Sequence, residues 1–307
     1  MTVAATRPLS VIGAPSSAGA YGPGQERAPA TFRHHGLIAE LAARGLDVTD
    51  RGDGATCHWE VDETNPTVSN VDVVAAVALE LADTVAAALA EDHNVLVLGG
   101  DCTVELGTVA GTIRDGATVG LAYIDLDADL NTPETGDGIL DWMGVAHLLD
   151  VQGADDRLSA LANRRPMLPP NAVRLFAVDN ITAAEQAVID RLDIGHEPLS
   201  AVLTDPSSVS ARTRSWAQSF DVLLVHVDAD VLDFVQFPIA ENTRVRPGLD
   251  LPSLEKLLTE LCALPNWRAL TLTEINPDHA PDEQQSFHQL IAMLGNVLEQ
   301  PRPTPLG

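Results

Sequence analysis

The segment YIDLDADLNTP, residues 123–133, is the part of the sequence around which the rest is organised. Its aspartates Asp125, Asp127 and Asp129 are two residues apart, and an extended backbone turns alternate side chains to one face. The preceding run VGLAYI, residues 119–124, is apolar without alternation, which is typical of a buried parallel strand. Ionised carboxylates that share a face repel one another unless a cation compensates them. The segment therefore predicts a cation site, with an aspartate-rich turn exposed to water as the alternative.

A second segment, DVLLVHVDADVLD at residues 221–233, repeats this design. An apolar run over residues 222–227 ends in Asp228 and Asp230, again two residues apart. In open parallel sheets, ligands bind at the carboxyl ends of the strands. Two strands that both end in spaced aspartates are a more specific signal than one. Together they predict a site for two divalent metal ions.

Apolar runs and helical patterns recur along the rest of the chain, which predicts an α/β fold. Further strands are expected at residues 9–14, 95–98, 169–178 and 268–277. One helix is expected from near Pro29 to Gly45, with the adjacent His34 and His35 on diverging faces. No low-complexity linker divides the sequence, so we predict a single domain over residues 1–307.

Composition excludes several classes of protein. The chain has 18 basic and 44 acidic residues and a net charge of −26, whereas nucleic-acid binding needs basic patches. No run of eighteen apolar residues is present, so we expect neither a membrane span nor a membrane partner. The N-terminus lacks the build of a secretory signal, and three scattered cysteines are typical of a reducing compartment. We therefore expect a cytoplasmic protein.

Other candidate residues lie close to the aspartates. The segment GGDCT, residues 99–103, follows a predicted strand and places Cys102 at the carboxyl edge of the sheet. A cysteine is most often a small buried hydrophobe, but here a metal ligand or a reactive thiol is an equal alternative. Asn131, Asp137 and Asp141 are candidates to line the mouth of the site, with turn and cap residues as the alternative.

Four motifs follow one another along the chain: GGDC from Gly99, DLDADLNTP from Asp125, VDADVLD from Val227 and EINP from Glu274. They resemble the ureohydrolase family of arginases, agmatinases and formiminoglutamases, whose pattern is GGDH, DAHxDxN, DxDxxDP and ExNP. The resemblance covers nearly the full length. It implies a three-layer α/β/α fold of the arginase/deacetylase type around a parallel eight-stranded sheet. It also implies a homo-oligomer, trimer or hexamer, that hydrolyses a guanidino or amidino C–N bond with a hydroxide bridging two manganese ions.

Carried over residue by residue, the resemblance implies that Asp125 and Asp228 bridge the metals, while Asp129 and Asp230 complete one metal each. Glu274 then pairs with the guanidinium group of the substrate, a match in charge and fork geometry. The full set comprises the predicted metal ligands Cys102, Asp125, Asp127, Asp129, Asp228 and Asp230, the catalytic candidates Asp129, Asp141 and Glu274, and the substrate-binding candidates Asn131 and Asp137.

The sequence departs from the family pattern at several of these positions. Cys102 and Asp127 stand where the family has its two histidine ligands, and Asp141 stands where a loop histidine helps to move protons. Phe234 replaces a proline after the second aspartate motif. Ile181 stands in the place of the acidic residue that grips an α-amino group, which argues against free arginine as the substrate.

These departures change the expected chemistry. Oxygen ligands suit Mn²⁺ or Mg²⁺, whereas a thiolate favours Zn²⁺ or Fe²⁺. Excess negative charge makes metal-bound water harder to deprotonate. His226, two residues before Asp228, is expected as a packed core histidine, with a substitute ligand or a partner of a ligand as the alternatives. Cys102 and the run NTPET also resemble a divergent branch that contains the hydroxyarginine-cleaving enzyme of cycloserine biosynthesis.

Three functions remain open from the sequence. The first is a metal-dependent amidine hydrolase of altered specificity. The second is a non-catalytic member of the family that keeps the fold for binding or assembly, which the loss of both histidines favours. The third makes Cys102 a covalent nucleophile, which requires an acid–base histidine, and His226 is the one candidate nearby.

Overall fold

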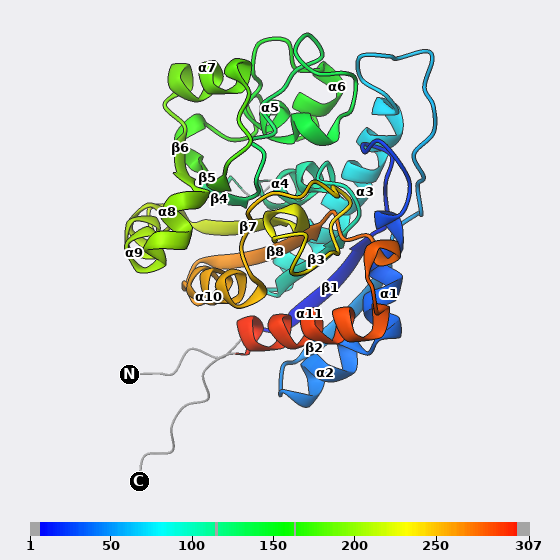
Figure 1. Ribbon diagram of the computed structural model, residues 1–307, viewed down its shortest axis with the longest axis vertical. Coiled ribbons are helices and arrows are strands. Elements are labelled where there is room, and N and C mark those ends of the chain that lie inside the picture. Colours follow the sequence, from blue (N-terminus) through cyan, green and yellow to red (C-terminus); the bar gives the residue numbers. More distant parts are fainter. Residues whose placement is uncertain (1–6, 114–115, 163, 300–307) are drawn as a thin grey trace.

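The computed structural model describes residues 7–299 except 114–115 and 163, so the ends of the predicted 1–307 domain lie outside the described residues. The described strands form one eight-stranded sheet in the order β2-β1-β3-β8-β7-β4-β5-β6, and every pairing is parallel (Figure 1). The strands are β1 Leu9–Ala14, β2 Val48–Asp53, β3 Asn94–Gly99, β4 Val119–Ile124, β5 Val173–Val178, β6 Gly195–Pro198, β7 Val222–Asp228 and β8 Trp267–Thr273.

Helices cover both faces of this sheet. One face packs against α1 Ala28–His34, α2 Leu37–Ala43, α8 Leu199–Thr204, α9 Pro206–Ala217, α10 Leu251–Cys262 and α11 Glu283–Leu298. The other packs against α3 Val71–Ala90, α4 Val104–Thr112, α5 Gly144–Leu148, α6 Asp156–Ser159 and α7 Ala183–Leu192. Short 3₁₀ turns occupy Gln25–Arg27, Asp141–Met143, Pro170–Ala172, Ala229–Val231 and Pro277–His279. Figure 1 shows α3, α4 and α5 above the sheet and α10 and α11 below it.

The central strands supply side chains to two hydrophobic cores in alternation. In β3, Val95 and Val97 pack beneath α3 and α4, whereas Leu96 and Leu98 pack into the opposite core. A strand buried on both faces has no polar side, which explains the unbroken apolar runs in the sequence. The predicted three-layer α/β/α fold with a parallel eight-stranded sheet is confirmed.

The sequence pattern did not identify the two edge strands. β2, with the sequence VTDRGD, and β6, with the sequence GHEP, close opposite ends of the sheet and are partly exposed. An edge strand packs fewer side chains into the core, so its composition is polar and resembles that of a loop. The expectation of eight strands came from the family resemblance alone.

The single helix expected over residues 29–45 is instead two helices, α1 and α2. Gly36 separates them with a φ of 87°, a left-handed conformation that interrupts a right-handed helix. The bend lets α1 and α2 cover different parts of the same face of the sheet.

In the described part of the chain, one helix, α3, is long and apolar enough to span a membrane by composition. Its buried positions include Val74, Val77, Ala78 and Leu81, which form one stripe at helical spacing. That stripe packs against the sheet and α4 in the second core, as expected for a core helix.

The chain packs closely around Gly100, next to the site, and a substitution at this residue can test that packing. A Cβ atom at this position would lie 1.8 Å from the backbone oxygen of Ser16, and a backbone atom cannot swing away. We expect Gly100→Ala to lower the free energy of unfolding by about 1–3 kcal/mol or more, measured by urea denaturation. The control is Gly22→Ala, whose Cβ would meet its nearest atom at 3.9 Å. Equal stability of the two variants would contradict this packing.

Candidate metal centre

The order of the strands brings the four sequence motifs together. β3, β8, β7 and β4 are consecutive in the sheet, and each ends either just before one of the motifs or within its first two residues. Ile124 pairs with Val227, so Asp125 and Asp228 leave neighbouring strands side by side. The cysteine and carboxylates of these motifs, far apart in the sequence, therefore meet at the carboxyl ends of the strands, as expected for open parallel sheets.

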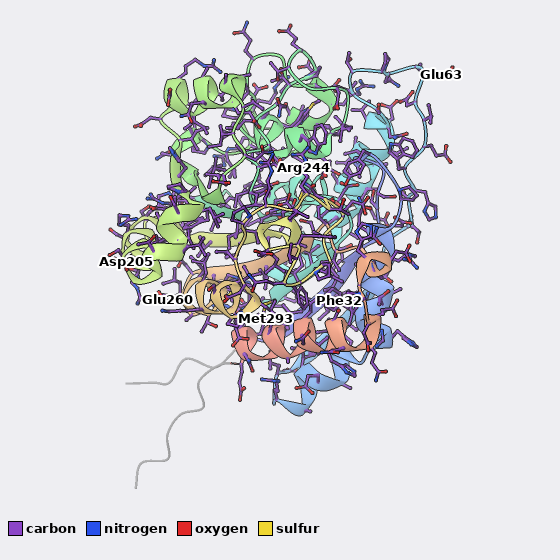
Figure 2. The ribbon with its side chains drawn as sticks, in the orientation of Figure 1. Phe32, Glu63, Asp205, Arg244, Glu260 and Met293 are labelled. Atoms are coloured by element: carbon purple, nitrogen blue, oxygen red, sulfur yellow. The ribbon has the colours of Figure 1, made fainter. Side chains whose placement is uncertain are left out.

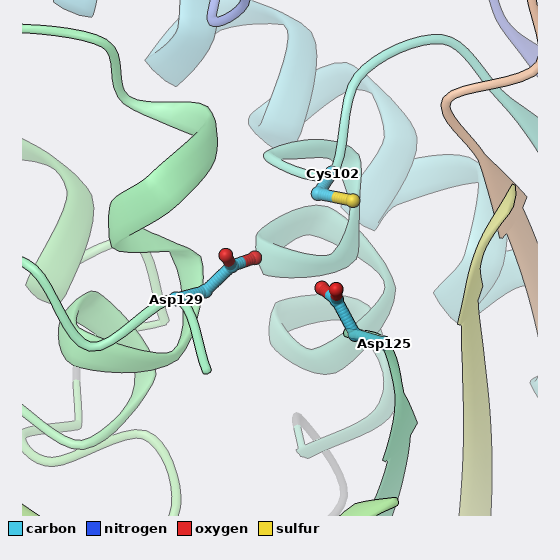
Figure 3. A group of neighbouring side chains, drawn as sticks. All are labelled: Cys102, Asp125 and Asp129. Atoms are coloured by element: carbon cyan, nitrogen blue, oxygen red, sulfur yellow. The ribbon is translucent and has the colours of Figure 1, made fainter. Parts of the chain in front are cut away.

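Two groups of side chains at this edge have the spacing of metal ligands. One donor atom each from Cys102, Asp125 and Asp129 lie within 4.8 Å of one another, and so do donors from Asp125, Asp228 and Asp230. Figure 3 shows the thiol of Cys102 and the carboxylates of Asp125 and Asp129 around a common space. The Cys102 Sγ also lies 3.2 Å from Asp228 Oδ2, so Asp228 adjoins the first group as well.

Asp141 and Glu274 form a third buried group with Cys102. The carboxylate of Asp141 accepts a 2.6 Å hydrogen bond at Oδ1 from the backbone nitrogen of Cys102. Glu274 follows β8 with a φ of 58°, and Asp129 has a φ of 51°. A left-handed backbone is unfavourable for residues with a side chain, so the surrounding fold holds both carboxylates in place.

Burial and mutual repulsion dominate the electrostatics of this site. Burial, and next the neighbouring carboxylates, raise the pKa values of Asp125, Asp129, Asp228 and Glu274 well above their ordinary values. Asp125 Oδ2, Asp230 Oδ1 and Glu274 Oε1 are buried oxygens with no hydrogen-bond partner among the described residues. Divalent cations would relieve both penalties, and the oxygen-rich donor set with one thiol is suited to them.

Asp127 lies apart from these groups. We expected it to share a face with Asp125 and Asp129, but β4 ends at Ile124 and the strand alternation ends with it. The Asp127 carboxylate instead accepts a hydrogen bond at Oδ1 from Asn180 Nδ2. Burial, and next the charge of Asp230, raise its pKa to about 7. Its assignment as a metal ligand stays a prediction.

His226 lies one layer beneath the metal-binding groups. It is fully buried and its ring stacks on Tyr123, with ring centres 4.1 Å apart. Its Nε2 lies 3.3 Å from Thr273 Oγ1, and its Nδ1 lies 3.3 Å from Glu105 Oε2. Thr273 Oγ1 in turn lies 3.0 Å from the Cys102 Sγ. His226 therefore reaches Cys102 through Thr273 and makes no direct contact with the thiol.

The loop after β4 contains the two substrate-binding candidates. Asn131 is half-buried, and its Nδ2 donates a 3.1 Å hydrogen bond to Glu185 Oε1, whereas Asp137 is exposed. Glu185 is buried and also forms a capping box with Thr182 at the start of α7. We did not identify Glu185 from the sequence, although a threonine followed three residues later by glutamate is the signature of this cap.

A model of the arginase family matches residues 7–298. The chain belongs to the arginase family. It is 27% identical over 289 residues to human mitochondrial arginase-2, covering 91% of this chain and 80% of that protein. It is 26% identical over 296 residues to the arginase of Staphylococcus aureus strain MRSA252, and the match covers 94% of this chain and 95% of that protein.

Solved structures of arginase-family proteins have the same fold. Arginase from Bacillus caldovelox superposes with a TM-score of 0.85 at 23% identity, covering 96% of this chain and 99% of that chain. Formimidoylglutamase from Bacillus subtilis superposes with a TM-score of 0.73 at 18% identity, and the match covers 95% of this chain and 86% of that chain. At these identities the likeness concerns the fold.

The raised pKa values predict an unusual pH dependence for metal-free protein. The carboxyl groups at this site have higher pKa values in the folded state than in the unfolded state, in which their pKa values are about 4. The folded state therefore binds more protons. Their contribution to stability is complete below about pH 4 and is lost as the pH rises through the folded values. We expect the chelator-treated protein to melt at a higher temperature at pH 5.5 than at pH 8.

Mn²⁺ is expected to reverse this trend by binding the ionised folded state at pH 8. Carboxylates whose pKa is lowered, such as Asp50 beside Arg33, lose their contribution only as the pH falls below about 4, outside this range. Burial lowers the pKa of His147 to about 4, so this one group opposes the trend as the pH falls through about 6.5, against the four carboxylates that produce it. A metal-free protein that melts at a higher temperature at pH 8 than at pH 5.5, and does not respond to Mn²⁺, would contradict the interpretation.

Proposed function

We propose that this arginase-family protein is a metal-dependent hydrolase that cleaves a C–N bond of a linear guanidino or amidino compound. The observation that carries the proposal is the buried convergence of one thiol and several carboxylates at the ends of four adjacent strands. Such a concentration of negative charge is stable at neutral pH only with protons or cations. Membership of the arginase family supports the choice of cations.

Two divalent ions, most simply Mn²⁺, are the proposed cofactors. Cys102 and Asp129 would hold one ion, Asp230 would hold the other, and Asp125 and Asp228 would be shared. Bound ions of this kind supply Lewis acidity and lower the pKa of water. The predicted ligand role of Asp127 is not part of this set, because its carboxylate is engaged by Asn180.

Protein side chains would orient the substrate and manage its protons. Glu274 has a buried oxygen without a partner, and a carboxylate can pair with both N–H groups of an amidine. Burial, and next the charge of Asp101, raise the pKa of Asp141 well above its ordinary value. Because Oδ1 accepts from the backbone nitrogen of Cys102, Oδ2 of Asp141 would be the atom that carries a proton to the leaving nitrogen.

Removing a shared ligand tests this function. We expect Asp228→Asn to lower the metal content and to reduce urea or ammonia release from a panel of guanidino and formimino compounds by about 100-fold or more, because even indirect partners of a metal contribute up to that factor. Metal content is measured by elemental analysis after purification with Mn²⁺. The matched control is Asp47→Asn, at an exposed position beside the opposite ends of the strands.

Wild-type protein that holds no divalent metal and hydrolyses none of the panel would contradict the proposed function. The second candidate, a non-catalytic role in binding or assembly, would then stand. Burial, and next the charge of Asp228, raise the pKa of the Cys102 thiol well above its ordinary value, so a metal ion would have to displace the thiol proton in order to bind there. The replacement of both family histidines is the observation that favours this second candidate.

Two substitutions of Cys102 separate the remaining interpretations. If the thiol is a metal ligand, Cys102→Ser is expected to lower the occupancy of one metal site and weaken turnover, and Cys102→His to retain or increase Mn²⁺ binding. If the thiol is the nucleophile, Cys102→Ser abolishes turnover without changing the metal content. Elemental analysis beside a urea assay distinguishes these results. The absence of a direct contact between Cys102 and His226 favours the first.

We further propose that the chain acts as one ureohydrolase-like domain on a small-molecule substrate. A trimeric or hexameric assembly, a cytoplasmic location and kinship with the hydroxyarginine-cleaving branch stay predictions. Light scattering of the metal-loaded protein would test the first of these.

A further inference from the structure

Two aromatic rings are stacked inside the sheet, beneath the candidate metal centre. Tyr123 of β4 and His226 of β7 are paired directly across neighbouring strands. Their ring planes differ by 6° and the ring centres are 4.1 Å apart. Both side chains are buried, in an interior that Figure 2 shows crowded with side chains. Buried polar groups need hydrogen-bond partners, so these two rings, here called the stacked pair, depend on partners within the protein.

The hydroxyl of Tyr123 contacts a proposed metal ligand directly. It donates a hydrogen bond to Oδ2 of Asp129, whose φ of 51° is unfavourable for a residue with a side chain. Such a backbone persists only where surrounding contacts hold it. Figure 3 shows the Asp129 carboxylate facing the space that it shares with Cys102 and Asp125. Tyr123 therefore fixes the position of one of these three donors.

The ring of His226 reaches a second donor through one hydroxyl. His226 Nε2 lies 3.3 Å from Thr273 Oγ1, and this oxygen lies 3.0 Å from Cys102 Sγ. The same oxygen is 3.0 Å from the backbone oxygen of Val227, which offers it a further acceptor. A hydroxyl has one hydrogen and two lone pairs, and it turns to donate or to accept. Thr273 can therefore contact the sulfur both as a thiol and as a thiolate bound to metal.

Glu105 holds the other side of the His226 ring. Its Oε2 lies 3.3 Å from His226 Nδ1, and the side chains are 2% and 0% exposed. Glu105 belongs to the turn that begins α4, and its backbone nitrogen donates a 3.1 Å bond to the backbone oxygen of Cys102. The segment that carries the thiol thus also carries the anchor of the ring beneath it. Buried pairs of ionisable groups are often no more stabilising than apolar residues of similar volume, so packing alone does not account for this pair.

We propose that the stacked pair positions Asp129 and Cys102 as ligands of one metal ion, and that it sets the affinity for this ion without touching it. The inference rests on the proposed function, in which these two residues would hold the same ion. Groups that hold metal ligands in place contribute roughly 10- to 100-fold to metal affinity. Asp230, which would hold the other ion, accepts a 3.0 Å hydrogen bond from Asn242 instead. The effect therefore concerns the ion at the thiol.

The competing explanation is that the stacked pair only fills the interior of the sheet. In that case, removing a hydroxyl from this network lowers the stability of the protein and leaves metal affinity unchanged, or weakens the binding of both ions alike. The two explanations therefore differ in which ion is affected.

Co²⁺ is the probe for the test, because a thiolate bound to Co²⁺ gives a near-ultraviolet charge-transfer band that carboxylates do not give. The metal-free full chain is titrated with Co²⁺, the band reports on the ion at the thiol, and calorimetry reports on both ions. We expect Thr273→Val, which removes the hydroxyl beside the sulfur, to raise the Kd read from the band by roughly 10- to 100-fold. Tyr123→Phe keeps the stacked ring without its hydroxyl and is expected to weaken the same ion.

Two further variants control for lost packing. Thr273→Ser restores the hydroxyl and is expected to restore the Kd of the wild type. Thr271→Val removes another buried hydroxyl from the same strand, one whose oxygen lies 3.3 Å from Thr108 Oγ1. We expect this variant to bind Co²⁺ with the affinities of the wild type, whatever its Tm.

Failure of this inference is distinct from failure of the proposed function. Wild-type protein that binds no Co²⁺ would contradict the metal centre itself, and the inference with it. Co²⁺ bound without the thiolate band would overturn the inference alone. So would Kd values in Thr273→Val and Tyr123→Phe that equal those of the wild type, or an equal weakening of both ions in these variants.

Discussion

Repulsion among buried carboxylates is the constraint on which the rest of the structure depends. Asp125, Asp129, Asp228 and Glu274 are each almost completely removed from water, and their charges face one another at the ends of adjacent strands. Left ionised and uncompensated, such a group would cost far more than the few kilocalories by which a domain is stable. The packing of two helical layers and the hydrogen bonds around the site hold these side chains together against that cost.

The central part of this arrangement could be predicted from the sequence because it depends on strands buried on both faces. Such strands are continuous apolar runs, and the polar residues that follow them are conspicuous. Asp125 and Asp228 were identified in this way, whereas the role of Glu274 came from the family resemblance. The resemblance also implied a parallel sheet, which the structure confirms, but the order of strands that brings β4, β7 and β8 together was not predicted.

Features set by local backbone geometry could not be predicted in the same way. Alternation along a strand grouped Asp127 with Asp125 and Asp129, but β4 ends at Ile124 and the Asp127 carboxylate accepts a hydrogen bond from Asn180. Asn180 and Arg246 gave no signal at all, because their partners come from loops distant in the sequence. Edge strands were missed for a different reason, since half-exposed strands carry the polar composition of loops.

Glu185 connects the stability of a helix to the shape of the site. One of its oxygens accepts from the backbone of Thr182, which begins α7, and the other accepts from Leu130 and Asn131 in the loop after β4. The first turn of α7 and the loop after β4 therefore share one side chain. If that turn frays, Asn131 loses its hydrogen bond in the same event, so local unfolding of a peripheral helix and loosening of the loop after β4 belong to a single cooperative unit.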